Sequence, residues 1–232
     1  LNELRREAID TLNTKRENIP DKIVEKKYIR EVPEFKKENS INACVFKDSD
    51  IDNATKYQNI YSYQEDTKYL RVLPNVISEY SNDLKNLSLK PVLVGEIGGL
   101  NLANIHADYS LNVVNSYTVA FLHSLGVKKI TLSYEMTRSQ IKILIDKYQE
   151  RYGCFPNIEV IAYGYIKIMT LKYNLLSDYE EAVYLKDRFN NNYRIRKYNG
   201  LTEVYYSKIL DNRNIDYFSI GVNHVRYNLY KF

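Results

Sequence analysis

The chain has 232 residues, of which 44% are hydrophobic, so it is long and apolar enough to bury the core of one large domain. Its formal net charge of +4, from 33 basic and 29 acidic residues, is a mild excess that permits RNA as a partner without requiring it. No apolar run approaches the roughly 18 residues that a membrane span needs, and no segment has the character of a secretory signal. We therefore expect a cytoplasmic protein with no membrane partner.

The first forty residues are predicted to lie outside the main domain. Residues 1–16 have the period of an amphipathic helix, and residues 17–40 are charged, carry two prolines and lack a lasting period. The apolar face of the helix carries Leu1, Leu4, Ala8 and Leu12. We interpret residues 1–40 as a helix and a connector, and residues 41–232 as the main domain. Because Leu1 opens directly in helical sequence, we expect the C-terminal part of a longer protein, whose N-terminal half is a partner.

From residue 41 onward, short apolar runs alternate with helical segments. The predicted strands are 42–47, 59–63, 68–73, 91–96, 105–110, 128–133, 158–163 and 215–221. Strands that alternate with helices imply a parallel sheet, and eight of them imply a closed barrel whose interior side chains just fill it. We therefore predict an α/β fold, a TIM-like eight-stranded barrel. An open doubly wound sheet is the alternative, but no Gly-rich phosphate turn supports it.

Two of the predicted helices have clear boundaries. One spans residues 138–151, where Thr137 and Gln140 can form a capping box and Gly153 ends the helix. Its buried stripe is predicted to be Ile141, Leu144, Ile145 and Tyr148. The other helix spans residues 116–125.

One segment, residues 183–208, breaks the alternation of strands and helices. It has an alternating pattern with a turn at residues 190–192, which is typical of a β-hairpin. We predict that this hairpin is inserted between the last two barrel strands. Its basic and aromatic side chains are Arg188, Tyr193, Arg194, Arg196 and Lys197. They can stack on RNA, or they can form an ordinary solvated hairpin face.

Barrel enzymes place their chemistry at the carboxyl ends of the strands. Polar side chains at or just beyond the predicted strand ends are Arg71, Glu96, Asp108, Ser110, Asn112, Ser133, Glu135, Tyr163, Tyr165, Asn223 and His224. We predict that this ring binds a small ligand or a base; the alternative is that each residue is a loop-end polar group or a helix cap. Asp108 and Glu135 are the catalytic candidates, and the residues that would bind the substrate are Arg71, Glu96, Ser110, Asn112, Ser133, Tyr163 and Tyr165. Ser110, Asn112 and Ser133 would orient it, since Ser110 and Asn112 share one side of their strand end with Asp108.

The other chemical signals are weak. His106, His123 and His224 do not have the spacing of metal ligands, and His123 is expected on the outer surface of a helix. The stretch GEIGGL at residues 95–100 does not match a dinucleotide-binding pattern, so we interpret its glycines as a tight turn. The two cysteines are expected to be free thiols in a reducing cytoplasm rather than a disulfide.

A longer string carries a resemblance to a known family. ADYSLNVVNS at residues 107–116, followed by a helix and by GVKKITLSYE at 126–135, is similar to the collagenase-like peptidases, peptidase family U32. Members of that family carry a similar Asp-Tyr-Ser-Leu-Asn stretch and then Ser-x-Glu at the next strand end. Further similar stretches are LNELRREAI at 1–9, IEVIAYGYIKIM at 158–169, YLKDR at 184–188 and TEVYYSK at 202–208.

The resemblance implies more than one activity. The family is named for proteolysis, but several of its branches are implicated in hydroxylating RNA bases of tRNA or rRNA, or the ubiquinone ring. Those branches are associated with an iron–sulfur cluster held by cysteines, and prephenate is implicated in some of the reactions. The resemblance therefore implies a barrel that acts in RNA-base hydroxylation, with tRNA or rRNA as partner. A peptidase and a catalytically silent interaction barrel are the alternatives.

The chain departs from the family pattern where the family has cysteines. Asn174 follows Tyr173 where the family has Tyr-Cys, and Gly200 aligns with the hairpin cysteine. Tyr165 and Lys167 stand where the family has the arginine of Tyr-Gly-Arg and a following proline. A cluster needs about four thiolate ligands, and this chain has two cysteines in all. We predict that this chain holds no cluster and no other cofactor, while prephenate is a ligand that the resemblance allows.

Overall fold

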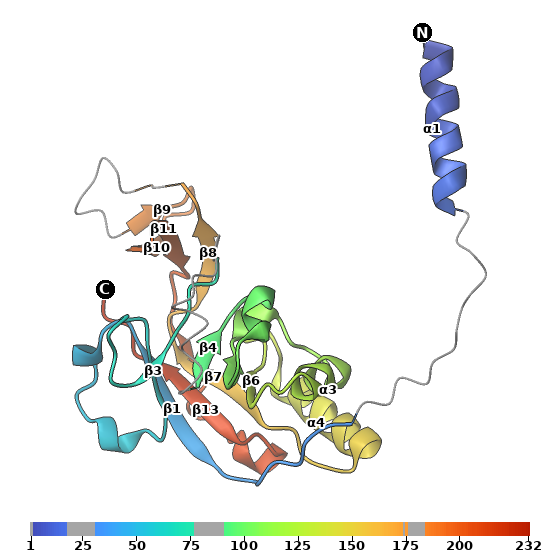
Figure 1. Ribbon diagram of the computed structural model, residues 1–232. Helices are drawn as coiled ribbons and strands as arrows, with labels where there is room; N and C mark the ends of the chain where they lie inside the picture. The colour runs from blue at the N-terminus through green and yellow to red at the C-terminus, as the bar shows by residue number, and fades with distance from the viewer. Residues whose placement is uncertain (1, 18–30, 77–90, 174, 176–183) are drawn as a thin grey trace.

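The centre of the molecule is a barrel of parallel strands (Figure 1). The computed structural model describes residues 2–17, 31–76, 91–173, 175 and 184–232. Within these residues the barrel strands are β1 (Ser40–Val45), β2 (Ile60–Ser62), β3 (Leu70–Arg71), β4 (Val92–Val94), β5 (Ile105–Ala107), β6 (Lys129–Thr131), β7 (Ile158–Gly164) and β13 (His224–Asn228). They pair in the order β3–β2–β1–β13–β7–β6–β5–β4. A parallel bridge between Val72 and Leu93 joins the two ends of this sheet, so the predicted TIM-like α/β barrel is confirmed.

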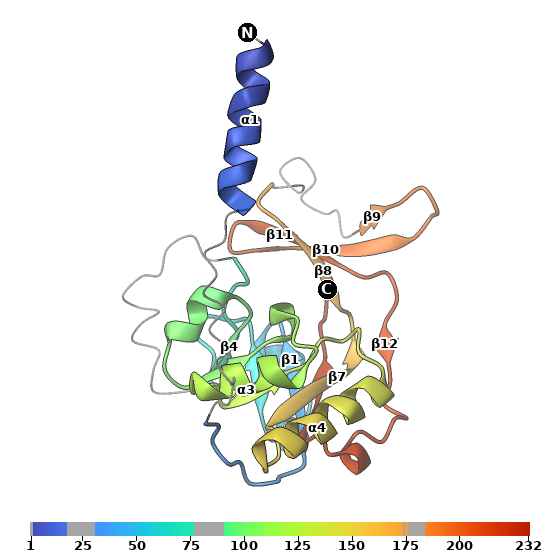
Figure 2. The same ribbon diagram turned by 90° about the vertical axis from the view of Figure 1, so that its right-hand side faces the viewer.

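The helices α3 (Ser116–Ser124) and α4 (Arg138–Tyr152) cover one side of the barrel and contact each other (Figure 2). The predicted boundary signals of α4 are confirmed: Thr137 and Gln140 form a capping box, and Gly153 follows the helix with φ of 70°. The buried residues of α4 are those of the predicted stripe, Ile141, Leu144, Ile145 and Tyr148. They pack in one apolar cluster with outward-facing side chains of the strands, such as Ile130 and Val160.

The prediction that His123 lies on the surface was wrong, because α3 turns this side chain toward the barrel. Only 1% of His123 is exposed, and its Nδ1 lies 2.8 Å from the carbonyl oxygen of Val127. Burial lowers the pKa of His123 to about 4, so the ring is neutral at neutral pH. His123 is thus a structural residue that joins α3 to the loop after it.

The eighth strand was also predicted at the wrong place. Residues 215–221 contain a short 3-10 helix, η6 (Phe218–Ile220), and Ile220 packs with α4 outside the barrel. The true last strand is β13, which carries His224, Arg226 and Asn228 toward the interior. Residues 215–221 were predicted to be a strand because they form an apolar run. The strand β13 was not predicted, because three polar inward-facing residues are unusual in a buried strand.

Between β7 and β13 the chain forms a second sheet, so the predicted insertion is confirmed. Its described strands are β8 (Lys167–Leu171), β9 (Tyr184–Lys186), β10 (Asn192–Tyr198) and β11 (Leu201–Tyr205), in the order β8–β11–β10–β9. The predicted turn joins β9 to β10. The tight turn between β10 and β11 was not predicted; it uses Asn199 and Gly200, with φ of 49° and 72°. The short strand β12 (Leu210–Asp211) then pairs antiparallel with β7.

The remaining described elements are α1 and four short 3-10 helices. The latter are η1 (Asp48–Asp50), η2 (Ala54–Lys56), η4 (Ile97–Asn101) and η5 (Tyr109–Leu111). The helix α1 spans Asn2–Glu17, as predicted, and stands away from the barrel in Figures 1 and 2, with no buried residue. Among the described residues, no helix combines the length and the apolar character that crossing a membrane requires.

Candidate functional site

Aromatic rings fill the carboxyl-terminal mouth of the barrel. Phe46 and Tyr63 directly follow β1 and β2, Tyr230 lies two residues beyond the end of β13, and Tyr205 of β11 lies among them. Phe46 stacks on Tyr230 with 4.3 Å between ring centroids, and edge contacts join Phe46 to Tyr63 and to Tyr205. We call these four rings the aromatic plug. It occupies the place where many barrels bind substrate.

Two basic residues of the second sheet, Arg196 of β10 and Lys167 of β8, lie close to the aromatic plug. The guanidinium of Arg196 lies 3.8 Å from the centroid of Phe46 and 4.9 Å from that of Tyr63. Lys167 Nζ forms a buried ion pair with Glu203 Oε1 at 2.7 Å, and the hydroxyl of Tyr205 donates to Glu203 Oε2. Arg196 therefore packs inside the fold, and it is not part of a solvated hairpin face.

Beside the plug lies a cavity of about 280 Å³, which we call the strand-end cavity. Four of the predicted site residues line it: Ser110, Asn112, Ser133 and Glu135. They come together because β5 and β6 are parallel neighbours, so the segments after these strands meet at the same edge of the barrel. Lys167, Tyr109, Thr170 and Asn75 also contribute polar groups to the wall.

The turn after β5 gives the cavity its shape. Asp108 caps η5 by accepting a hydrogen bond from the backbone N–H of Tyr109 at 2.9 Å. Ser110 Oγ donates to the carbonyl oxygen of Gly95 at 2.7 Å, and Asn112 ends η5 in the left-handed region with φ of 51°. The Ser110 side chain and the backbone at Asn112 are thus fixed before any ligand binds.

Arg71, Glu96 and Asp108 lie outside both this cavity and the one described next, as do Asn223 and His224. Asp108 is 2% exposed and points into the barrel, where its Oδ1 meets Arg226 Nη2 at 2.6 Å. Glu96 accepts hydrogen bonds from the backbone N–H groups of Gly98 and Gly99 and caps η4. Arg71 pairs with Glu65 at 3.5 Å. Since Glu96 occupies the N–H groups of the glycine stretch, that stretch forms a tight turn.

The two predicted tyrosines lie elsewhere. Tyr163 and Tyr165 line a second cavity of about 420 Å³, at the ends of β1, β7 and β13. Its wall has no residue in common with that of the strand-end cavity. Of the predicted ring, four residues therefore line the strand-end cavity, two line the second cavity, and five line neither.

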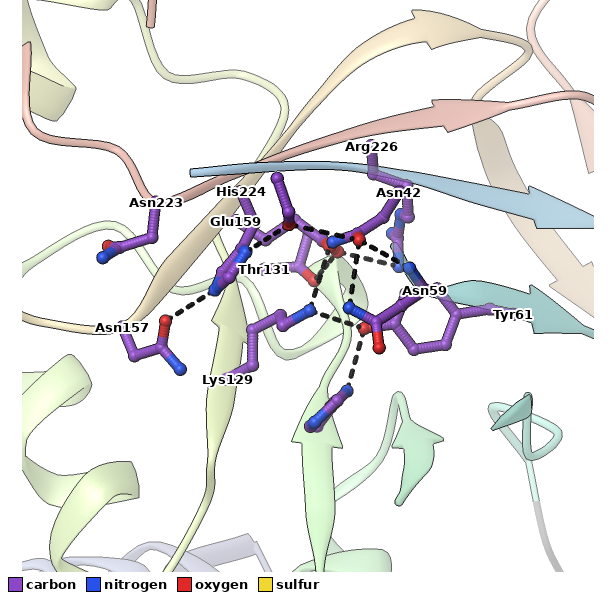
Figure 3. Close-up of polar contacts among 12 residues, drawn as sticks. Asn42, Asn59, Tyr61, Lys129, Thr131, Asn157, Glu159, Asn223, His224 and Arg226 are labelled. Carbon is purple, nitrogen blue, oxygen red and sulfur yellow. Dashed lines mark hydrogen bonds and ion pairs between the residues drawn. The ribbon is translucent and has the colours of Figure 1, made fainter. Parts of the chain in front are cut away.

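The interior of the barrel below the plug is polar (Figure 3). This was not predicted from the sequence. Arg226 lies between two carboxylates, Asp108 at 2.6 Å and Glu159 at 3.4 Å. Glu159 also accepts hydrogen bonds from Asn42 at 2.6 Å and from Thr131 at 3.0 Å. Burial alone would raise the pKa of Glu159, but the positive charges of Arg226 and Lys129 outweigh it and lower this pKa. These contacts tie four strands and the turn after β5 together around one charged centre.

Asn223 and His224 were predicted to follow the last strand, and this was wrong because that strand begins at His224. His224 Nδ1 lies 2.6 Å from Ser40 Oγ, and its Nε2 lies 2.7 Å from Asn157 Oδ1 (Figure 3). Burial and the nearby charge of Lys129 lower the pKa of His224 to about 4. Both residues therefore lie at the amino-terminal end of the barrel, opposite the two cavities.

The residues present do not fit an iron–sulfur cluster. Cys44 is buried in β1, where burial raises the pKa of its thiol to about 12, and Cys154 lies beyond the end of α4. Both are free thiols, and a cluster takes about four such ligands. Within the described ranges, no group of three or more His, Cys, Asp or Glu side chains is arranged to hold a metal ion.

The fold and the strand-end cavity define an α/β barrel with a preformed polar site at the carboxyl ends of β5 and β6. The family model described as peptidase family U32 matches residues 74–200, which is more than half of the chain. The protein therefore belongs to peptidase family U32, and the predicted family is confirmed. No match was found among curated proteins or among solved structures.

Proposed function

We propose that this barrel acts in the hydroxylation of tRNA or rRNA bases, as a part without a cluster that binds and orients the base. One observation carries the proposal: Ser110, Asn112, Ser133 and Glu135, which follow two different strands, line a single cavity of about 280 Å³. The resemblance to family branches that act on RNA bases points to the same class of ligand. This role requires a partner, which we expect to be the N-terminal half of a longer parent protein.

The wall chemistry of the strand-end cavity suits a nucleobase. The edge of a base presents hydrogen-bond donors and acceptors side by side, and proteins read it with amides, hydroxyls and carboxylates. Asn112 offers both a donor and an acceptor, Ser133 offers a hydroxyl, and Glu135 offers a carboxylate that accepts from an exocyclic amine. Tyr109 and Tyr134 line the same wall and provide aromatic surface.

Within this proposal the residues of the chain position the base and do not oxidise it. The oxidising group belongs to another part of the machinery, because the two cysteines here do not make a cluster site. Glu135 lies at the exposed lip of the cavity and is the group able to hold or release a proton beside the ligand. Asp108 acts indirectly, because it caps the turn that carries Ser110 and Asn112.

The experiment is mass spectrometry of nucleosides from total tRNA and rRNA of cells with and without the full-length gene. Loss of a hydroxylated pyrimidine on deletion, restored by the wild-type gene, is the expected result. Glu135→Ala should fail to restore the modification while leaving thermal stability nearly unchanged, because this side chain is exposed. Glu150→Ala, a change of another exposed glutamate on α4, is the matched control and should restore it. An unchanged nucleoside profile on deletion would overturn the proposal.

Proteolysis is the second candidate, because the family description names peptidases. A hydrolytic site needs a nucleophile beside a base, yet His106, His123 and His224 all lie outside the walls of the two cavities. Cys44 is a buried thiol with its pKa raised to about 12, which disfavours the reactive thiolate. Incubation of the purified chain with gelatin and a peptide library tests this candidate, and cleavage that Glu135→Ala abolishes would favour it.

A further inference from the structure

A third cavity, of about 310 Å³, lies on the outside of the barrel, and we call it the outer groove. Ile41 of β1 and Val225 of β13 belong to its wall. Each of them precedes a residue that contacts Glu159 inside the barrel, Asn42 or Arg226. Because neighbouring side chains of a strand point to opposite faces, Ile41 and Val225 point outward. The outer groove therefore lies on the outer face of the paired strands β1 and β13.

The wall of the outer groove is mainly apolar. Besides Ile41 and Val225, its apolar and aromatic members are Ala162, Ile215, Tyr217, Phe218 and Tyr227. Several of these side chains, such as Ile41, Ile215 and Tyr227, are only partly buried, so the groove presents apolar surface to solvent. Apolar surface that is gathered in one exposed place commonly marks a docking site.

A helix is the element that normally covers such a place, because helices form an outer ring around the strands of a β/α barrel. Among the described residues, no α-helix contributes to the wall of the outer groove. The described residues after β13 do not cover it either, since Tyr230 and Phe232 pack on Phe46 at the barrel mouth. Within the described part of the chain, this position in the ring of helices is therefore open.

The helix α1 has an apolar face that packs against nothing in the described structure (Figure 1). Leu4, Ala8 and Leu12 follow one another at intervals of four residues, so they lie on one face. Leu4 and Leu12 are 72% and 48% exposed. An isolated helix of 16 residues with a single alanine is only marginally stable in water, and helices in proteins gain most of their stability by packing such a face.

The connector between α1 and β1 is long enough to bring the helix to the outer groove. Its residues 31–39 lie against the fold through contacts of Phe35 with His123 and of Lys37 with Phe155. The segment 18–30, when extended, can span up to about 45 Å. A domain of about 190 residues has a diameter of roughly 40 Å, so α1 can reach any side of the barrel.

We propose that α1 docks its apolar face in the outer groove of its own chain and so adds a helix to the ring around the barrel. Its two leucines then cover Ile41 and Val225. Arg16 extends the same face of α1 by one turn beyond Leu12, and Asp216 in the wall of the groove offers it a partner of opposite charge. Docking fixes the place where the chain on the N-terminal side of α1 leaves the barrel. It does not depend on the hydroxylation role proposed above.

The test is NMR of the whole chain with a spin label on α1 and isotope-labelled methyl groups. The label is attached at Asn13→Cys, outside the apolar face, in a Cys154→Ser background, because the other native thiol is buried. The signals of Ile41 and Val225 should broaden strongly, and the signal of Val119 in α3 should not. No broadening at the groove, or equal broadening of Val119, would overturn the proposal.

A mixed sample separates docking within one chain from docking between copies. It combines spin-labelled chain that carries no isotope with isotope-labelled chain that carries no spin label. The signals of Ile41 and Val225 should stay sharp in this sample. Broadening there would show that α1 docks in the groove of a second copy, and it would overturn the assignment to its own chain.

Variants of the helix test which face docks. Leu4→Gln with Leu12→Gln should remove the broadening, because glutamine keeps a high helix propensity but takes away the apolar face. Glu7→Gln with Asp10→Gln changes two residues outside that face, is the matched control and should keep the broadening. Broadening that persists after the leucines are replaced would contradict the proposal.

A variant of the groove tests the other side of the contact. Ile215→Gln changes a partly buried residue of the wall and should also remove the broadening. If this variant does not fold, the two leucine changes in α1 still decide the question, since α1 has no buried residue and its substitution leaves the barrel intact. Full broadening in folded Ile215→Gln would show that α1 docks elsewhere.

Discussion

The guanidinium of Arg226 lies 2.6 Å from the carboxylate of Asp108, and both side chains are almost completely buried in the barrel. This contact links β13 to the turn after β5, since Asp108 also caps η5. The residues that shape the strand-end cavity therefore depend on a charge inside the barrel. Glu159, 3.4 Å from the same guanidinium, makes the arrangement a bridge between two carboxylates.

Replacing Arg226 by methionine should destabilise the protein strongly. The substitution leaves Asp108 and Glu159 as buried carboxylates without their main cation, a situation that costs about 3–5 kcal/mol of unfolding free energy. Arg213→Met is the control, because its ion pair with Asp211 is about half exposed and should contribute little to stability. Urea denaturation at neutral pH measures both. Similar losses in the two variants would show that the buried bridge has no special role.

Gly95→Ala should disturb the strand-end cavity through Ser110. A Cβ atom at Gly95 would overlap Ser110 Oγ and would lie 2.9 Å from Asn75 Oδ1, so Ser110 has to move. We expect a loss of about 1–3 kcal/mol of stability, as for other overpacked sites. The double variant Gly95→Ala with Ser110→Ala should recover part of that loss. Thermal denaturation of the single and double variants checks this, and a double variant as unstable as the sum of the two single changes would contradict it.

The protein should lose stability as the pH falls below neutral. The pKa values of His123 and His224 are lowered to about 4, and that of His106 to about 3, from an unfolded value of 6.5. Between pH 6.5 and about 4 the unfolded chain therefore binds more protons than the folded chain, so unfolding becomes easier as the pH falls. Each histidine that stays neutral in the fold costs about 1.4 kcal/mol per pH unit in that window.

Urea denaturation at several pH values across this window measures the effect. His224→Asn removes one of the three titrations and should make the dependence on pH shallower. Stability that stays constant from about pH 7 to about pH 5 would show that the three rings are not held neutral inside the fold.

The purified chain should not acquire a cysteine-held iron–sulfur cluster. Anaerobic reconstitution with iron and sulfide, followed by assay of both after desalting, should leave no stoichiometric content of either, because two cysteines are too few ligands. The double variant Cys44→Ser with Cys154→Ser is the control for iron bound at other groups. Iron that the wild-type chain retains and the double variant loses would refute the prediction.

Much of the barrel could be predicted from sequence because seven of its strands are short apolar runs between helix signals. The eighth, β13, could not, because its inward-facing residues include His224 and Arg226, which pair with polar groups from distant strands. The sequence does carry one strand signal for β13, which is the alternation of His224, Arg226 and Asn228 with Val225 and Tyr227. Alternation of this kind normally indicates a half-exposed strand, and only the fold shows that here the polar side faces inward.

The candidate site was predictable where neighbouring strands bring their ends together. Ser110 and Ser133 converge because β5 and β6 are adjacent and parallel. The sequence could not show that Asp108 and Glu96 lie outside the site. Both carboxylates directly follow a strand, where a carboxylate can either cap a turn or contact a ligand, and here both cap a turn.

The aromatic plug limits the directions from which a ligand can reach the barrel. With Phe46, Tyr63, Tyr205 and Tyr230 packed together across the mouth, nothing can enter along the barrel axis. The walls of the two cavities share no residue, so one cavity can fill while the other is empty. A substitution in one cavity should consequently leave the affinity of the other unchanged, and a bound molecule need not leave before a second one docks.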